Sequence, residues 1–358
     1  MKTKVKTLNF EGQKIYVGID VHLKRWTVAI FLENTFYRKF SQNASALELG
    51  RYLRKHFPKG EYYSVYESGF CGYSVHRELE SEGIHNIIVN AADVPTTDKE
   101  RKQKDDSRDS MKLAKSLRSG ELTGIYIPKI STVEFRGLVR FRSTTVKEIR
   151  RNKTRIKSYL YSNGISIPQE LDSASKYWSG RFTQWLSTVQ LSTDAGNMVL
   201  KETLENVLHL RTQLLKINRT LRSMAKNGQY STKLKLLMGI PGIGLISAAT
   251  FLSELEDITR FRNLDTFCSY VGLVPSTYSS GETEIIRGIT PRANNHLRNV
   301  TIECSWIAVR QDPALLLKFS ELSQRMKKNN AIVRIAKKLL NRIRYVMKNE
   351  TEYVCAVV

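Results

Sequence analysis

The order of apolar segments in the first ninety residues constrains the fold more than any other feature of this sequence. Residues 14–22, 25–33, 35–41, 62–69 and 84–90 have strand character, and residues 45–57 and 74–82 have helical periodicity. The first three strand segments follow one another directly, which predicts an antiparallel meander. Each of the later two follows a helix, as strands joined by helical crossovers do. The sequence therefore predicts a mixed α/β sheet in its first third.

Two of these strand segments end on a carboxylate. KIYVGIDVH reaches Asp20, and YYSVYESG reaches Glu67. Functional groups in such sheets gather at the carboxyl ends of the strands. Asp20 and Glu67 are thus candidate site residues.

A cluster of acids, KDDSRD at 104–109, precedes an apolar helical pattern in an otherwise basic chain. Asp106 and Asp109 are three apart and therefore project from the same side of the first helical turn. Asp105 lies between the helical positions and is expected to be solvated.

The four carboxylates have the chemistry of a magnesium site. Mg²⁺ prefers hard oxygen ligands, and two such ions about 4 Å apart can hold the attacking and leaving oxygens of a phosphodiester. The candidate ligands are Asp20, Glu67, Asp106 and Asp109. The alternative is structural, because aspartate is also favoured as a helix cap and near the positive end of the helix dipole.

The charge balance predicts a polyanionic partner. Fifty-seven Lys and Arg against 34 Asp and Glu give a formal net charge of +23. Nucleic acid is the commonest such partner, and a membrane surface is the alternative. No apolar run approaches the roughly 18 residues of a membrane span, and the first ten residues lack a signal peptide's apolar core. The four cysteines are scattered singly, which is typical of a reducing cytoplasm rather than of a zinc or disulfide framework.

The last third contains two motifs that suit a phosphate. In LLMGIPGIGLISAATFLSEL, Gly242 and Gly244 allow a tight turn that presents backbone amides at a helix N-terminus. This pattern is typical of a helix-hairpin-helix that holds nucleic-acid backbone, and a plain turn between helices is the alternative. The turn-rich VPSTYSSG then carries two serines before a glycine, either an exposed nucleophile or a flexible linker. The candidate nucleic-acid-binding residues are Gly242, Gly244, Arg287, Thr290, Arg292, Asn294 and Arg298.

The remaining segments are basic and helical. Residues 132–162 carry nine basic side chains at helical spacing. Apolar residues then alternate in steps of three and four, as in a coiled-coil seam, and belong either to an intramolecular hairpin or to a dimer: Val207, Leu210, Leu214, Ile217, Leu221 and Met224. Residues 322–349 form a basic amphipathic helix, expected to lie on nucleic acid rather than on lipid or a calmodulin-like partner.

Several motifs, in this order, resemble the insertion-sequence 110 family of DEDD transposases, which are related to the Piv-type DNA invertases: GIDVHLKRWTVAIF, YESG, KDDSRDSMKLA, LMGIPGIGLISA, GLVPSTYSSG and GITPRANNHLR. The resemblance covers nearly the whole chain. It implies an RNase H-like, RuvC-like catalytic domain at 1–128 and a basic helical and coiled-coil region at 129–232. A transposase C-terminal domain at 233–358 would hold the helix-hairpin-helix, the serine turn and the basic tail helix.

The resemblance also assigns the site. The family's metal-binding tetrad falls on the four carboxylates Asp20, Glu67, Asp106 and Asp109, with Mg²⁺, or Mn²⁺, as cofactor. Its nucleophilic serine falls on Ser280, with Ser279 as the near rival. Two departures bear on this assignment. Lys-Asp-Asp stands where the family usually has Lys-Thr-Asp, which leaves the third ligand open by one position, and Pro-Arg-Ala-Asn stands where it usually has Lys-Gly-Asn.

As partners the resemblance implies donor and target DNA, a structured bridge RNA that guides both choices, and further copies of the chain in a dimer or tetramer. The compartment implied is the prokaryotic cytoplasm, at the nucleoid. Three alternatives remain. A Holliday-junction-type endonuclease would not need Ser280. A non-catalytic DNA- or RNA-binding protein on a decayed nuclease scaffold would show no activity with any metal, and a Piv-like invertase would act without guide RNA.

Overall fold

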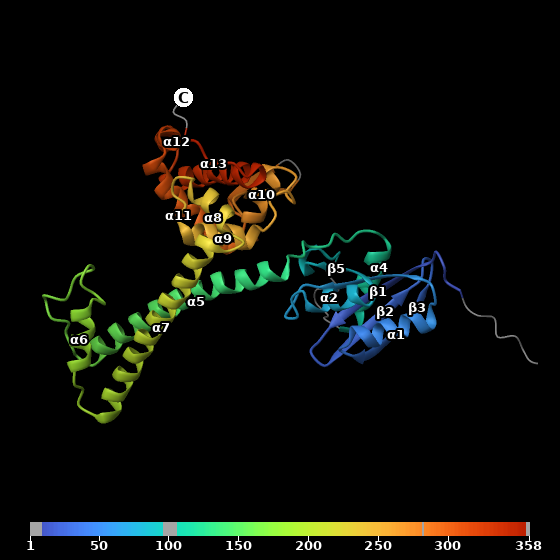
Figure 1. Ribbon diagram of the computed structural model, residues 1–358, viewed down its shortest axis with the longest axis horizontal. Helices are drawn as coiled ribbons and strands as arrows, with labels where there is room; N and C mark the ends of the chain where they lie inside the picture. Colours follow the sequence, from blue (N-terminus) through green and yellow to red (C-terminus); the bar gives the residue numbers. More distant parts are fainter. Residues whose placement is uncertain (1–8, 96–105, 281–282, 356–358) are drawn as a thin grey trace, which may run out of the picture. The chain divides into compact units, whose positions relative to one another are not determined.

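The computed structural model describes residues 9–95, 106–280 and 283–355, without the side chains of 106–108, 277–280 and 283–287 (Figure 1). The chain divides into two compact units, residues 1–127 and 128–358, each with its own core. The further division predicted at residues 232–233 stays a prediction.

The first unit is built on a five-stranded mixed sheet. Its strands are β1 (Lys14–Val21), β2 (Arg25–Phe31), β3 (Phe36–Asn43), β4 (Glu61–Glu67) and β5 (His85–Val89). They lie in the order β3-β2-β1-β4-β5, in which β1, β2 and β3 are antiparallel and β1, β4 and β5 are parallel. The predicted meander and the predicted crossovers are confirmed.

Helices cover both faces of this sheet. On one face, α1 (Ala46–His56) and α2 (Ser74–Ser81) bury an apolar core that includes Trp26 and Tyr66. A short 3₁₀ turn, η1 (Ala91–Asp93), follows β5. On the opposite face lies α4 (Asp106–Arg118), whose Leu113 packs against Val65 of β4. The arrangement is consistent with an RNase H-like fold.

Two long antiparallel helices, α5 (Ile130–Ser162) and α7 (Asp194–Asn227), leave the second core together and form a hairpin (Figure 1). Near one end Arg142 donates to Asn218 at 2.7 Å, and near the other the Tyr159 hydroxyl donates to the Gly196 carbonyl at 3.3 Å. In the sequence α6 (Gly180–Thr188) lies between α5 and α7, and it packs on both helices at the far end of the hairpin. The apolar seam of α7 therefore faces α5 in the same chain, and coiled-coil packing in the strict sense stays a prediction.

The rest of the second unit is a helical core with one β-hairpin. Its elements are α8 (Ser231–Met238), α9 (Leu245–Leu255), α10 (Leu264–Val271), β6 (Pro275–Ser280), β7 (Thr283–Ile289), α11 (Asn295–Gln311), α12 (Pro313–Arg325) and α13 (Lys328–Asn349). The apolar stripe of α13, including Ile335, Leu339 and Ile343, is completely buried in this core. The tail's apolar face therefore serves the core rather than lipid. Within the described residues, every helix falls short of the length and apolarity that a membrane span requires.

Candidate active site

The carboxyl ends of β1 and β4 bring Asp20 and Glu67 next to each other. These strands are parallel neighbours, and their register pairs Ile19 with Tyr66, the residues directly before the two acids. Neighbouring strands are about 4.8 Å apart. Alternation along each strand puts Asp20 on the same face as Gly18, and Glu67 on the same face as Val65, which is the face that α4 covers. The two acids therefore share one corner of one face.

The start of α4 lies toward the same corner. A Cβ added to Gly18 would stand 2.0 Å from the Ser110 carbonyl oxygen and 2.5 Å from the Ala114 amide nitrogen, so α4 packs directly on the β1 backbone. The Arg118 guanidinium, at the end of α4, lies 5.2 Å from the ring of Phe31, which pairs with Tyr16 near the start of β1. The helix thus runs opposite to β1, and its first turn lies toward the Asp20 end.

That first turn carries the other two predicted ligands. Asp106 begins α4, and Asp109 is half-buried within it. Asp106 lies one helical turn before Ser110, and Asp109 lies one turn before Leu113; both Ser110 and Leu113 face the sheet. The side chain of Asp106 lies outside the described residues. Among the side chains that are described, no three His, Cys, Asp or Glu groups form a cluster that could hold a metal ion. The fold brings Asp20, Glu67 and the start of α4 to one corner, and the ligand set stays a prediction.

Hard oxygen donors dominate this corner, which fits Mg²⁺ or Mn²⁺ and not a soft metal. The pairing of β1 with β4 and the absence of a side chain at Gly18 bring the backbones of three acid-bearing elements to this corner. The donor set is thus compatible with a divalent metal of the magnesium class.

His22 is a neighbour of this site that the sequence pattern could have revealed. Its Nε2 lies 3.0 Å from Oδ2 of Asp20, and the two side chains are 54% and 21% exposed. Residues two apart on an extended chain project from the same side, so the spacing of Asp20 and His22 was the available signal. The imidazole can hold the carboxylate in one orientation.

Tyr66 anchors the segment that follows Glu67. Its hydroxyl donates to the Gly72 carbonyl at 3.2 Å and accepts from the His76 amide at 3.1 Å. Burial raises the pKa of this phenol, which keeps it protonated as a donor. Both bonds tie the chain after β4 back under the sheet, and so the end of β4 has a fixed place.

The predicted serine stands in the second unit, in a β-hairpin rather than a loop. Strand β6 pairs antiparallel with β7, and Ser280 is opposite Thr283, the last pair before the connection. Its side chain and that of Arg287 in β7 lie outside the described residues. The segment VPSTYSSG, which the sequence predicts to be turn-rich, is therefore mostly strand, and Ser280 lies at the end of that strand.

The glycines between α8 and α9 have different environments. Gly242 has φ +87°, and a Cβ there would meet the Cys304 carbonyl oxygen at 2.5 Å, so the turn packs tightly on α11. Its amide donates to Oε1 of Gln311 at 2.9 Å. Gly244 precedes α9, is exposed and has open space around it, and no side chain caps the helix there. Gly244 is the more accessible of the two for a phosphate.

Two of the predicted nucleic-acid-binding residues also hold the protein together. Asn294 caps α11 by accepting from the amides of His296 and Leu297, and its side-chain amide donates to Glu254 at 2.9 Å. The Arg298 guanidinium donates to the carbonyl of Thr290 at 2.7 Å. Their role toward nucleic acid stays a prediction, as does that of Arg287, Thr290 and Arg292.

Glu254 is the buried acid at the centre of this network. Its side chain is 2% exposed and accepts from Arg140 at 2.7 and 2.9 Å, and Arg136 lies 3.8 Å away. Burial raises the pKa of Glu254, but the hydrogen bonds from Arg140 and Asn294 and the nearby positive charges outweigh it, so the pKa lies below its usual value. This charged network joins α5, α9 and α11.

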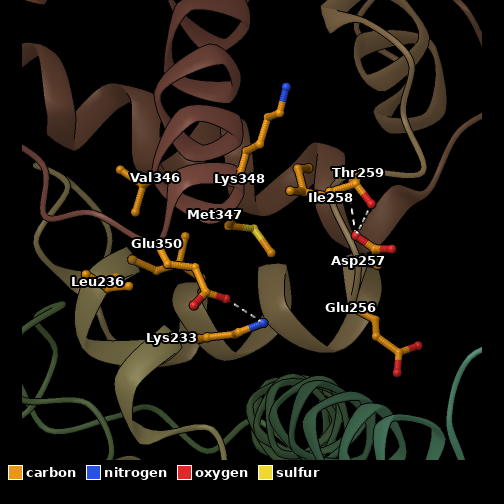
Figure 2. Close-up of a pocket in the computed structure, with 11 residues that line it drawn as sticks. Lys233, Leu236, Glu256, Asp257, Ile258, Thr259, Val346, Met347, Lys348 and Glu350 are labelled. Carbon is orange, nitrogen blue, oxygen red and sulfur yellow. Dashed lines mark hydrogen bonds and ion pairs between the residues drawn. The ribbon is translucent and has the colours of Figure 1, made fainter.

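A cavity of about 150 Å³ lies among α8, the turn after α9 and the end of α13. Figure 2 shows Lys233 and Glu350 paired on one side of it, 3.1 Å apart, with Asp257 bonded to Thr259 on the opposite side. The residues that line this cavity include none of the predicted site residues. The cavity is therefore separate from the residues expected to act on DNA.

Comparisons with known proteins agree with the resemblance. Residues 17–163 match a family model of DEDD transposases of the IS110 type, and residues 234–320 match the transposase IS116/IS110/IS902 family. The chain is 28% identical to the y4qE transposase of Sinorhizobium fredii, over 82% of this chain and 72% of that protein. It is 25% identical to the transposase of IS1533 from Leptospira borgpetersenii (70% and 72% covered) and 24% identical to that of IS1111A from Coxiella burnetii (80% and 78%). The two matched segments contain the carboxylate corner and the serine hairpin, and the chain belongs to the IS110 family of transposases, enzymes that cut and rejoin DNA.

Proposed function

We propose that this transposase cuts DNA with a site in two parts, a metal-binding carboxylate corner and a serine nucleophile. The corner consists of Asp20, Glu67, Asp106 and Asp109, and the nucleophile is Ser280. The observation that carries the proposal is the direct packing of α4 on Gly18, because it brings the start of a helix with two acids to the strand ends that carry the other two.

A bound Mg²⁺ would supply charge neutralisation at the scissile phosphate and at the leaving oxygen. The residues of the chain do the rest. The Ser280 oxygen attacks the phosphorus and gives its proton to water, the bond from phosphorus to the 3′-oxygen breaks, the released 3′-oxygen takes up a proton, and the strand is left as a phosphoserine ester. Attack by a free 3′-hydroxyl on that ester rejoins DNA and restores the serine. The energy of the original phosphodiester is kept in the ester, so no nucleotide cofactor is consumed.

The guide and the assembly belong to the same proposal. A protein of net charge +23 can hold much nucleic-acid backbone without reading its sequence, and a bridge RNA would then select donor and target DNA by base pairing. Further copies of the chain, in a dimer or tetramer, would bring serine and carboxylates together. RNA recovered from the purified protein and the mass of the RNA-bound particle test these two points.

The central experiment is a cleavage assay with labelled DNA that carries the joined ends of the element, its flanking RNA and Mg²⁺, analysed before and after protease. Wild type should give a protein-linked DNA band, which Asp106→Asn and Ser280→Ala should each abolish. Asp105→Asn and Ser279→Ala are the matched controls, one residue away in each motif, and should keep the band. Cleavage without a covalent band in Ser280→Ala would replace the proposal by a hydrolytic endonuclease of the Holliday-junction type.

A further inference from the structure

The far end of the α5–α7 hairpin carries a fixed aromatic platform that the proposed chemistry does not use. Trp178 and Tyr177 pack on Phe182 of α6, with ring centroids 5.2 and 5.5 Å away. Trp178 has φ +66°, a conformation that bulky side chains rarely adopt and that often marks functional positions. The Trp178 carbonyl accepts a hydrogen bond from Arg211 at 3.3 Å, so α7 holds the backbone at Trp178 in place.

Three cations gather on this platform. The ammonium of Lys153 lies 5.1 Å from the centre of the Trp178 ring, and that of Lys157 lies 3.6 Å from the Tyr177 ring. The pKa of Lys153 is lowered by burial and by the nearby positive charge of Arg211, because the fold holds these two cations close together. In the part of the chain that the structure describes, none of these three cations has a carboxylate within ion-pair distance.

A further cation and a further aromatic ring extend the platform along α5. Arg150 is exposed on the turn before Lys153, and Tyr161 is 55% exposed on the turn after Lys157. Helical spacing puts these four residues on one side of α5, over a length of about 16 Å. Asp172 also contacts the platform, and its carboxylate accepts a hydrogen bond from the Tyr177 hydroxyl.

Cations interleaved with aromatic rings match the chemistry of an unpaired nucleic-acid strand, in which phosphates alternate with flat bases. An acidic peptide would satisfy the cations but would make no use of a ring platform held in a strained turn. We propose that the hairpin-end site, formed by Lys153, Lys157, Arg211, Tyr177 and Trp178, binds the backbone and a base of single-stranded nucleic acid, either DNA or RNA. The inference rests on the proposed function only in taking the natural ligand to be nucleic acid.

The first test compares affinities of the full-length protein for a labelled 20-nucleotide DNA and for an RNA of the same sequence, across a series of salt concentrations. Lys153→Gln/Lys157→Gln should weaken binding roughly tenfold or more near 0.1 M salt and reduce the slope of log K against log salt by about 1.4, since each lost phosphate contact contributes about 0.7. Lys201→Gln/Lys216→Gln, two exposed lysines of α7, removes the same charge and should leave affinity and slope nearly unchanged.

The RNA and DNA arms decide which strand occupies the site, because only the natural ligand's affinity should change strongly. A second measurement uses wild type alone: acetylation of lysines, read by mass spectrometry, should be slower at Lys153 and Lys157 when the oligonucleotide is bound, and unchanged at Lys201. Equal affinities for the two double variants, together with unprotected Lys153 and Lys157, would overturn the inference. Metal-dependent cleavage is assayed in parallel, so that a failure of the hairpin-end site can be told apart from a failure of the proposed cleavage mechanism.

Discussion

Gly18 positions a helix on the sheet although it carries no side chain. Its missing side chain allows the backbone of α4 to approach β1, and this contact brings the first turn of the helix toward the strand ends that carry Asp20 and Glu67. Gly242 acts in the same way in the second unit, against α11. Neither role could be predicted from the sequence, because a close approach depends on which backbone packs opposite the glycine.

Gly18→Ala should therefore damage the carboxylate corner without touching a carboxylate. The added methyl group would overlap the Ser110 carbonyl and the Ala114 amide, so α4 must shift, at a cost of about 1–3 kcal/mol in the free energy of unfolding. Chemical denaturation and the DNA cleavage assay measure the two effects. Gly137→Ala, on α5 with open space around it, is the matched control and should be neutral or slightly stabilising. A stable and fully active Gly18→Ala would contradict the packing argument.

Glu254→Gln should destabilise the second unit by about 3 kcal/mol at pH 7, because it leaves Arg140 and Arg136 partly buried without their counter-charge. The folded-state pKa of Glu254 lies below the unfolded value near 4.3. The carboxylate's contribution is thus fully present above about pH 4.3 and is lost as the pH falls through the folded-state pKa, so the difference from wild type should shrink in acid.

Unfolding curves for the wild type and Glu254→Gln between pH 3 and 8 check this expectation. Glu321→Gln removes an acid that is 41% exposed and bonded to Lys318, and it should have a much smaller effect at every pH. A pH-independent difference at Glu254 would mean that packing, and not charge, is what the substitution changes.

Elements with a clear period were predictable from the sequence, and those with an ambiguous composition were not. The strands around Asp20 and Glu67 and the seam of α7 follow their apolar patterns closely. The composition of β6, dominated by serine, threonine and proline, predicts a turn-rich segment, and only pairing with β7 makes it a strand. Asn294 and Arg298 also have structural roles that the sequence did not predict, as the cap of α11 and as a donor to the Thr290 carbonyl, while their role toward nucleic acid stays a prediction.

The turn between α8 and α9 offers a test at the scale of an element. Gly242→Ala should lower stability, because φ +87° and the Cys304 carbonyl both oppose a side chain. Gly244→Ala has room and an ordinary φ, so it should fold normally. If the start of α9 holds a phosphate, Gly244→Ala should weaken DNA binding several-fold by crowding the amides. Filter binding and thermal unfolding separate the two outcomes, and unchanged binding would leave a plain turn between helices.

Among the described residues the largest apolar core of the first unit lies under the sheet, and that of the second unit lies around α9, α11 and α13. Each buries its own apolar residues, and so the two units can unfold in separate transitions. Ser280 and the four carboxylates lie on different units.

Calorimetry can use the two transitions to locate the metal. If the carboxylate corner binds Mg²⁺, the ion should raise the stability of the first unit alone, by about 1.4 kcal/mol at ten times the dissociation constant. Asp20→Asn should remove this increase, while Asp172→Asn, which changes an acid of the second unit, should keep it. Stabilisation of the other transition, or an effect that survives Asp20→Asn, would place the metal elsewhere.

The packing of α5 has a consequence for how the chain folds while it is being synthesised. Phe135 and Val139, near the start of α5, pack in the same core as Ile343 and Val346. Helix α5 packs against α7 and α9, and at roughly 5–20 residues per second the ribosome completes the sheet unit roughly 6–26 s before the end of α9 emerges. During that interval part of the apolar face of α5 is uncovered, and the nascent chain is exposed to misassembly and to chaperones until α7 and α9 pack on it.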